Sequence, residues 1–152
     1  MQDPNLFIGI DPGKSGGVCA TTGSVSICSK CPGTVADMAT LLENILDLGT
    51  NPMCIIEAVH SFPGNSARSM FSFGENYGMW LGILASLHIP YIQVTPSKWM
   101  KIYGSLPKPK TERKNRLKHL AQQRYPTLHI TLATADAVLL AHYSFITYKS
   151  NH

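Results

Sequence analysis

Short apolar runs separated by turns dominate the first third of the chain. The runs at residues 6–10, 17–21 and 24–29 have the length and polarity of strands, and Pro-Gly-Lys-Ser-Gly separates the first two. Three strands joined by short turns predict antiparallel pairing. Two further runs, 54–57 and 90–94, predict a short buried strand and a fifth strand.

Helical periodicity accounts for most of the remaining chain. Thr34 is placed to cap a helix that carries apolar residues at helical spacing and ends at Gly49. Four more helices are expected: about 66–87, a short one from Pro96, a basic one over about 111–124, and an apolar one from a Thr134 cap to about Tyr148. The order β-β-β-α-β-α-β-α predicts an α/β fold, a five-stranded mixed sheet flanked by helices.

The chain has the size and composition of one globular unit. With 152 residues, of which 44% are hydrophobic, we expect a single domain over residues 1–152. No segment approaches the roughly 20 apolar residues that span a bilayer, and no basic start precedes an apolar run. Four cysteines are too few for a disulfide scaffold of this length. We expect an intracellular protein with no membrane partner.

Three carboxylates stand where apolar runs stop. Asp11 follows the first strand run, Glu57 ends the fourth, and Asp136 lies two residues past Thr134 at the start of the last helix. A carboxylate at the edge of a core is costly unless it is paired or binds a cation. Ligands collect at strand ends in such sheets, and a helix N-terminus favours an ionised acid. The three acids predict one site for Mg²⁺ or Mn²⁺.

Each acid also has an ordinary explanation. Asp11 could form an Asx turn, Glu57 could pair with a lysine, and Asp136 could simply favour the start of its helix. Together these explanations are less attractive, because the chain has only nine acids. Cys28 and Cys31 have the spacing of a zinc knuckle, but no second pair completes four ligands.

Charge is divided unevenly along the chain. Residues 1–57 carry six acids and two lysines, whereas residues 58–152 carry eleven Lys or Arg and three acids. The densest basic stretch is the helix over about 111–124 and the residues before it, where Glu112 is the only acid. Cations of this kind bind the phosphates of nucleic acids, although a solvated helix face is the alternative. The candidate DNA contacts are Lys98, Lys101, Lys108, Lys110, Arg113, Lys114 and Lys118.

Glycines recur every fourth residue in the long helix, at Gly74, Gly78 and Gly82, and the same helix carries Leu81 and Ala85. Each glycine costs about 1 kcal/mol in a helix interior, so three on one face indicate a close helix contact. The contact is either with the sheet of the same chain or with a second copy across a two-fold axis.

These segments, in this order and at these separations, resemble a known family. Gly-Ile-Asp-Pro-Gly at 9–13, Ile-Ile-Glu ending at Glu57, and Asp136 within its apolar helix resemble the RuvC-like Holliday junction resolvases of the RNase H-like superfamily, over nearly the whole chain. Phe-Gly-Glu-Asn-Tyr-Gly at 73–78 and Val-Thr-Pro-Ser-Lys-Trp at 94–99 are further matches. The compact length looks more like the phage or viral branch.

The resemblance implies a homodimeric endonuclease that cuts Holliday junctions and related branched DNA symmetrically, leaving 5′-phosphate and 3′-hydroxyl ends. Asp11, Glu57 and Asp136 would hold two Mg²⁺ ions per site, with Mn²⁺ as a substitute. Lys98 and Lys110 would act at the scissile phosphate. The protein would work in the cytoplasm of a bacterial or phage-infected cell.

Two further roles follow from the same resemblance. Phe62 matches an aromatic residue that stacks on an unpaired base, and His60 or the pair Phe71 and Phe73 are alternatives. The glycine-bearing helix, through Gly74, Gly78, Leu81, Gly82 and Ala85, would form the dimer interface.

One position departs from the family. A fourth metal ligand usually stands three or four residues before the last aspartate, where this chain has Leu132 and Ala133; His129 and His142 are candidate substitutes. The departure leaves open a protein that binds junctions but cuts them poorly. A nucleotide-binding fragment of the actin and sugar-kinase superfamily shares Gly-Ile-Asp-x-Gly, but a one-domain length argues against it.

Overall fold

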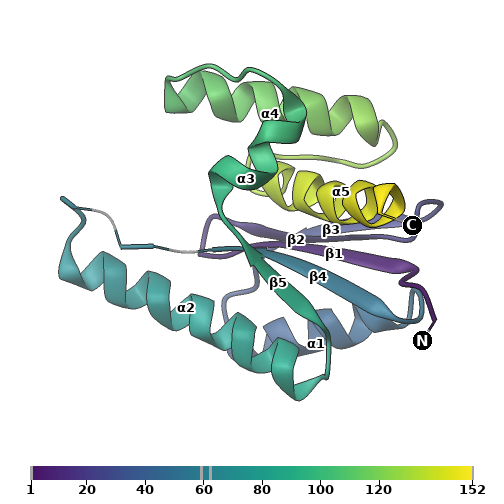
Figure 1. The fold of residues 1–152 in the computed structure, drawn as a ribbon. Coiled ribbons are helices and arrows are strands. Elements are labelled where there is room, and N and C mark those ends of the chain that lie inside the picture. The colour runs from purple at the N-terminus through teal and green to yellow at the C-terminus, as the bar shows by residue number, and fades with distance from the viewer. Residues whose placement is uncertain (1, 59, 62, 152) are drawn as a thin grey trace.

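A single mixed sheet forms the centre of the computed structural model, which describes residues 2–58, 60–61 and 63–151. Its strand order is β3-β2-β1-β4-β5 (Figure 1). The strands are β1 (Leu6–Asp11), β2 (Gly17–Thr21), β3 (Ser26–Lys30), β4 (Pro52–Glu57) and β5 (Tyr91–Val94). β1, β2 and β3 pair antiparallel, whereas β4 runs parallel to both β1 and β5. The five-stranded mixed sheet predicted from the sequence is confirmed.

Helices cover both faces of the sheet. The helices α1 (Val35–Leu46) and α2 (Ala67–Ser86) lie on one face, and α5 (Ala135–Ser150) lies on the other (Figure 1). The basic helix α4 (Lys110–Arg124) packs outside α5, and α3 (Pro96–Met100) with the 3₁₀ turn η1 (Lys101–Tyr103) connects β5 to it. None of the helices in the described residues is long and apolar enough to cross a membrane.

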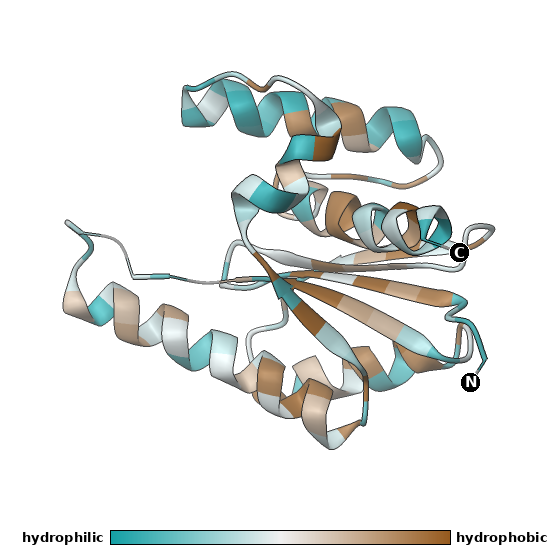
Figure 2. Cartoon of the chain, in the orientation of Figure 1, coloured by the Kyte–Doolittle hydropathy of each residue, from teal (hydrophilic) through white to brown (hydrophobic). Residues whose placement is uncertain are grey.

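Alternation along β1 divides its side chains between two cores. Leu6, Ile8 and Ile10 enter the core under α1 and α2, which also holds Trp80. The odd-numbered residues of β1 therefore face α5, because successive side chains of a strand point to opposite faces. Figure 2 shows the strands as largely hydrophobic and α4 as largely hydrophilic. The apolar strands are thus buried between the two helical layers, and the polar helix α4 lies at the surface.

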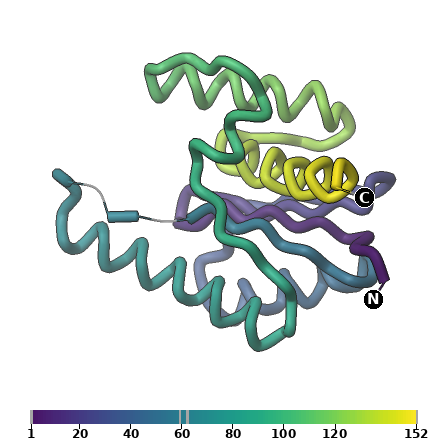
Figure 3. The backbone as a smooth tube through the Cα atoms, in the orientation of Figure 1, coloured from purple at the N-terminus to yellow at the C-terminus, as the bar shows by residue number. Residues whose placement is uncertain are grey.

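The two ends of the described chain lie on the same side of the molecule (Figure 3). The Tyr148 hydroxyl on α5 donates a hydrogen bond of 2.6 Å to Oδ1 of Asp3. The ring of Tyr148 also lies near Phe7 of β1, at 6.0 Å between centroids. The far end of α5 is therefore fastened to the beginning of β1.

Several element boundaries and one helix cap differ from the prediction. The third strand begins at Ser26, not at residue 24, because Thr22 N–H donates to the Val25 carbonyl and closes a turn at 2.9 Å. The first helix ends at Leu46, since the next two amides bond back three residues and tighten the last turn. Thr134 stands at the N-cap position, but its hydroxyl accepts from the Thr131 N–H at 3.0 Å and does not cap α5.

Candidate metal centre

The three predicted carboxylates come together at one edge of the sheet. Asp11, Glu57 and Asp136 each offer an oxygen, and these atoms all lie within 4.8 Å of one another. Asp11 ends β1, Glu57 ends the adjacent parallel strand, and Asp136 lies in the first turn of α5. On the parallel strands β1 and β4, the alternation directs Asp11 and Glu57 to the face on which α5 packs.

Gly9 determines how closely α5 approaches this edge. A Cβ atom on Gly9 would lie 2.3 Å from the Ala137 carbonyl oxygen and 2.4 Å from the Ala141 nitrogen. A Cβ atom on Gly17 would lie 2.7 Å from the Ala133 carbonyl oxygen. The α5 backbone therefore rests directly on β1, and the residues just before α5 rest on β2; these contacts bring Asp136 beside Asp11.

The carboxylates are electrostatically unfavourable without added positive charge. Burial, followed by the charges of Asp136 and Glu57, raises the pKa of Asp11 well above its usual value. Burial raises the pKa of Glu57 to about 7 and also raises the pKa of Asp136. The ionised forms of three half-buried acids that repel one another are stabilised most by a hard cation, which prefers oxygen ligands. The donor set fits a hard divalent cation; the choice of Mg²⁺ or Mn²⁺ stays a prediction.

Lys114 is the cation whose charge reaches all three acids. Its charge lowers the pKa of Asp11, Glu57 and Asp136 against the effect of burial, and Arg113 acts on Asp136 in the same direction. Both residues come from α4 and are half-buried, whereas most of that helix is exposed. Helix α4 therefore places Lys114 and Arg113 where their positive charges act on the carboxylate cluster.

Trp99 fixes the orientation of Glu57. Its indole N–H donates a hydrogen bond of 2.7 Å to Oε2 of Glu57, and the ring is fully buried. The ring packs edge-on against Tyr103 at 6.1 Å, and the Tyr103 hydroxyl donates to the Leu139 carbonyl at 2.8 Å. The Pro-Ser-Lys-Trp segment thus supports the metal centre through its tryptophan, a contact that the sequence did not reveal.

The turn after Asp11 is tied to α2. Gly13, at φ +106°, donates its N–H to Oδ1 of Asn76 at 2.8 Å, and the Phe73 ring lies where a Cβ atom on Gly13 would meet it at 2.6 Å. The Cys31 thiol donates to the Asp11 carbonyl oxygen at 3.3 Å. Asn76 and Phe73 of the Phe-Gly-Glu-Asn segment thus contact the turn that follows Asp11.

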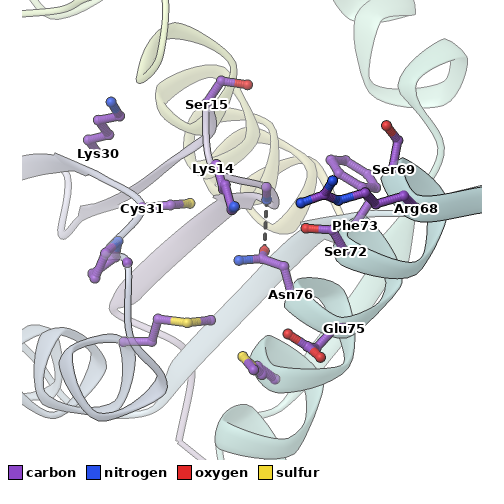
Figure 4. A pocket seen from close by; sticks show the side chains of 15 residues that line it. Lys14, Ser15, Lys30, Cys31, Arg68, Ser69, Ser72, Phe73, Glu75 and Asn76 are labelled. Atoms are coloured by element: carbon purple, nitrogen blue, oxygen red, sulfur yellow. Dashed lines mark hydrogen bonds between the residues drawn. The ribbon is translucent and has the colours of Figure 1, made fainter. Parts of the chain in front are cut away.

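A cleft of about 770 Å³ opens beside this turn, between the turn, Cys31 and α2. Lys14 from the turn and Arg68 from α2 line it, and Figure 4 shows them on either side of the bond between Gly13 and Asn76. Lys30 adds a third cation to its lining. Sequence analysis missed these three residues, because they lie far apart in the chain and outside any basic run.

The other predicted cations lie at the surface of the protein. Lys98, Lys101, Lys108 and Lys110 are exposed, and Lys118 is half-buried. Lys110 lines a second cleft, of about 540 Å³, together with His60 and Phe73. The proposed roles of Lys98 and Lys110 at a scissile phosphate stay predictions. Phe62, predicted to stack on a base, lies outside the described residues.

The glycine stripe on α2 faces open space. A Cβ atom on Gly74, Gly78 or Gly82 would meet nothing within 4 Å, and Ala85 is exposed while Leu81 is half-buried. The alternative that these glycines let α2 pack closely against the sheet of its own chain is wrong. The face that packs inward carries Trp80, Ile83 and Leu84 instead.

No substitute for the fourth ligand joins the described carboxylate cluster. Leu132 is 49% exposed and Ala133 is half-buried. His142 is a core residue: burial lowers its pKa to about 4, and its Nδ1 pairs with the Tyr125 hydroxyl at 3.1 Å. His129 is exposed and, like His142, is not among the described residues that group around a metal position.

The zinc alternative at Cys28 and Cys31 is wrong. Cys31 belongs to the core under α1 and α2, whereas Cys28 packs against the core under α5. The two thiols therefore lie on opposite faces of the sheet and cannot bind one ion together.

The fold matches solved structures over nearly its full length. One is "T. thermophilus RuvC in complex with Holliday junction substrate", with a TM-score of 0.67 and 13% identity over 97% of each chain. Another is "Thermus thermophilus RuvC structure", with a TM-score of 0.63 and 14% identity over 96% of each chain. No protein-family model and no curated protein matches the sequence. At these identities the likeness concerns the fold, and the chain has a RuvC-like form of the RNase H-like fold.

Proposed function

We propose that this protein is a metal-dependent endonuclease that cleaves Holliday junctions and related branched DNA. The observation that carries the proposal is the carboxylate cluster of Asp11, Glu57 and Asp136, in a fold like that of a RuvC bound to a Holliday junction. Two symmetric cuts, one per subunit, would leave 5′-phosphate and 3′-hydroxyl ends. Such an enzyme would act in the cytoplasm of a bacterial or phage-infected cell, and the compact chain fits a phage-type resolvase.

Asp11, Glu57 and Asp136 would hold the metal, with Mg²⁺ as the physiological ion and Mn²⁺ as its substitute. Two divalent ions held by these residues would supply Lewis-acid charge for phosphodiester hydrolysis. Trp99 keeps Glu57 in one orientation, and the close packing at Gly9 keeps Asp136 next to Asp11. The residues of the chain thus bring the donor oxygens together before substrate arrives.

DNA would approach across two basic surfaces on either side of the carboxylates. On the α4 side, Lys114 and Arg113 direct charge at the cluster, and Lys98, Lys108, Lys110 and Lys118 extend the positive surface. On the other side, Lys14 and Arg68 line the cleft beside the turn after Asp11. If one phosphate of a DNA strand lies at the metal, the neighbouring phosphates of that strand would lie within reach of both surfaces.

A homodimer suits this activity. A four-way junction has two-fold symmetry, and a C2 dimer presents two equivalent sites to it. The open glycine stripe on α2, with nothing within 4 Å of a Cβ atom at Gly74, Gly78 or Gly82, supports close contact with the same helix of a second copy.

A junction-binding protein that cuts poorly is the second candidate. It is favoured by one observation: Leu132 and Ala133 stand where a fourth ligand is expected, and neither can coordinate a metal. A nucleotide-binding protein is less well supported, because the likeness to a RuvC chain covers 97% of both chains and those ATPases close two domains around their nucleotide.

The test is cleavage of a synthetic mobile four-way junction beside a linear duplex of the same sequence, with Mg²⁺ and then with Mn²⁺. Paired symmetric nicks on the junction alone would support the resolvase. Tight junction binding without nicks in either metal would favour the junction-binding protein. Equal cutting of duplex and junction would contradict structure-selective cleavage.

A further inference from the structure

Two of the four cysteines face each other across adjacent strands. Cys19 of β2 and Cys28 of β3 are direct partners in the antiparallel ladder. Both lie on the α5 face of the sheet, where Cys19 is buried and Cys28 is half-buried. Neither takes part in the carboxylate cluster.

The hydrogen-bond pattern of the hairpin gives this pair the shorter of the two ladder spacings. Thr22 N–H donates to Val25 O at 2.9 Å and Cys31 N–H donates to Gly16 O at 3.0 Å, so both of these opposed pairs are hydrogen-bonded. Pairs alternate along an antiparallel ladder, which makes Cys19 and Cys28 a non-hydrogen-bonded pair. Cα atoms of such pairs lie about 4.5 Å apart, within the range that a disulfide bridges.

The two thiols also differ in reactivity. The Cys19 S–H can turn to the Cys28 sulfur once Cys28 is ionised, and this lowers the pKa of Cys28 to about 7 against the opposing effect of burial. Burial raises the pKa of Cys19 well above its usual value. Cys28 is therefore the accessible thiol that ionises readily, and Cys19 is a protected neighbour placed to react second.

We propose that Cys19 and Cys28 form a redox modification site, at which a small-molecule disulfide of the glutathione class converts the two thiols into an intramolecular disulfide. The site is separate from the carboxylate cluster and does not depend on the proposed nuclease activity.

The chemistry balances in two exchange steps. The Cys28 thiolate attacks one sulfur of the oxidant RSSR, the S–S bond breaks, and one RS⁻ leaves. Cys19 then releases its proton, and its sulfur attacks the Cys28 sulfur in the mixed disulfide and expels the second RS⁻. The protein loses two protons and two electrons, and RSSR becomes two RSH.

Oxidation acts on the segment that leads into α5. The Cys19 thiol donates to the Thr134 carbonyl oxygen at 3.7 Å, and the Cys28 thiol donates to the His129 carbonyl oxygen at 3.7 Å. A disulfide has no S–H, so both contacts are lost together. Residues 129–134 directly precede Asp136, and the site therefore couples the redox state of the pair to the support of one carboxylate.

Trypsin offers a sharp test of the pairing. Cleavage after Lys14 and Lys30 places Cys19 and Cys28 in one peptide, 15–30, while Cys31 and Cys54 fall in the next, 31–68. The protein is treated with oxidised glutathione, its free thiols are blocked, and it is digested. We expect peptide 15–30 to carry no blocking group, to be joined to no other peptide, and to be two hydrogens lighter than its reduced form. Peptide 15–30 found fully blocked, or joined to 31–68, would overturn the proposal.

Two serine variants serve as controls. Cys28→Ser alters a half-buried position, and Cys19→Ser keeps a hydroxyl that can donate to Thr134. The lighter peptide should be absent from both variants after the same treatment. Hydrogen exchange then tests the coupling: amides at 129–135 should exchange several-fold faster in the oxidised wild type than in the reduced protein, with α1 unchanged. Unchanged exchange at 129–135 after disulfide formation would overturn the coupling.

Discussion

The indole N–H of Trp99 donates a hydrogen bond of 2.7 Å to Oε2 of Glu57. This bond lowers the pKa of Glu57, but burial has the larger and opposite effect and leaves the pKa at about 7. The carboxylate is thus held in place for a ligand that brings positive charge, and the protein alone does not fully stabilise its ionised form.

Glu57→Gln is expected to stabilise the metal-free protein at pH 8, because the amide oxygen can still accept from Trp99 and no charge is buried. The pKa of Glu57 rises from 4.5 to about 7 on folding, so its contribution to stability is fully present below pH 4.5 and is lost as the pH rises through 7. We expect a gain on the order of 2 kcal/mol at pH 8, measured by urea unfolding in EDTA.

The same experiment at pH 5 and pH 8 provides the check. Wild type should lose more stability than Glu57→Gln between the two pH values, whereas Glu43→Gln on the exposed side of α1 should follow wild type. Mn²⁺ should recover the stability of wild type at pH 8 by binding the folded state. Equal pH dependence in wild type and Glu57→Gln would show that burial of this acid has no such cost.

Gly9→Ala should unfold or severely weaken the protein. The added methyl would lie 2.3 Å from a backbone oxygen of α5 and 2.4 Å from a backbone nitrogen, and neither atom can move without shifting the helix. We expect a loss of about 3 kcal/mol or more in urea unfolding. Gly33→Ala is the control, since its Cβ atom would meet nothing within 4 Å. Similar stability of the two variants would refute the close packing of α5 on β1.

Lys114→Ala should slow junction cleavage more than it weakens junction binding. Lys114 is the cation whose charge acts on all three carboxylates, and charge near a reacting phosphate contributes most in the transition state. We expect single-turnover cleavage to fall by about 10-fold or more. Lys118→Ala, on the next turn of α4, should mainly reduce binding. The prediction fails if both variants lose binding and cleavage in the same proportion.

Gly78→Arg should separate the dimer and leave the fold intact. The position faces open space in the single chain, so a long side chain fits there, but it would block close contact between two α2 helices. Sedimentation should give a dimer for wild type and a monomer for the variant, with similar circular dichroism. A variant that remains dimeric would place the interface elsewhere, and a monomeric wild type would contradict the dimer itself.

Much of the fold followed from local patterns. The strands of the sheet were predicted from short apolar runs, and the three acids from their positions where such runs end. These features are local, because alternation and run length are read from neighbouring residues. The predicted closeness of Asp11 and Glu57 then needed only that β1 and β4 pair.

The contacts that support the three acids could not be predicted, because they join segments with no shared local pattern. The bond from Trp99 to Glu57 spans 42 residues, and the bond from Gly13 to Asn76 spans 63. Lys14 and Arg68 share a cleft only because α2 lies beside the first turn. Thr134 looked like a cap because of its residue type, but the preceding loop takes its hydroxyl. In each case tertiary packing decides between partners that the local sequence leaves equivalent.

The most direct test of the metal centre is junction cleavage and junction binding by Asp11→Asn, measured side by side in Mg²⁺. Asp11 is one of the three acids whose oxygens lie within 4.8 Å of one another, and asparagine has nearly the same shape, so the fold and the basic surfaces should persist. We expect cleavage to be abolished while the affinity for the junction stays within a few-fold of wild type. A variant that cuts the junction at the wild-type rate would contradict this prediction.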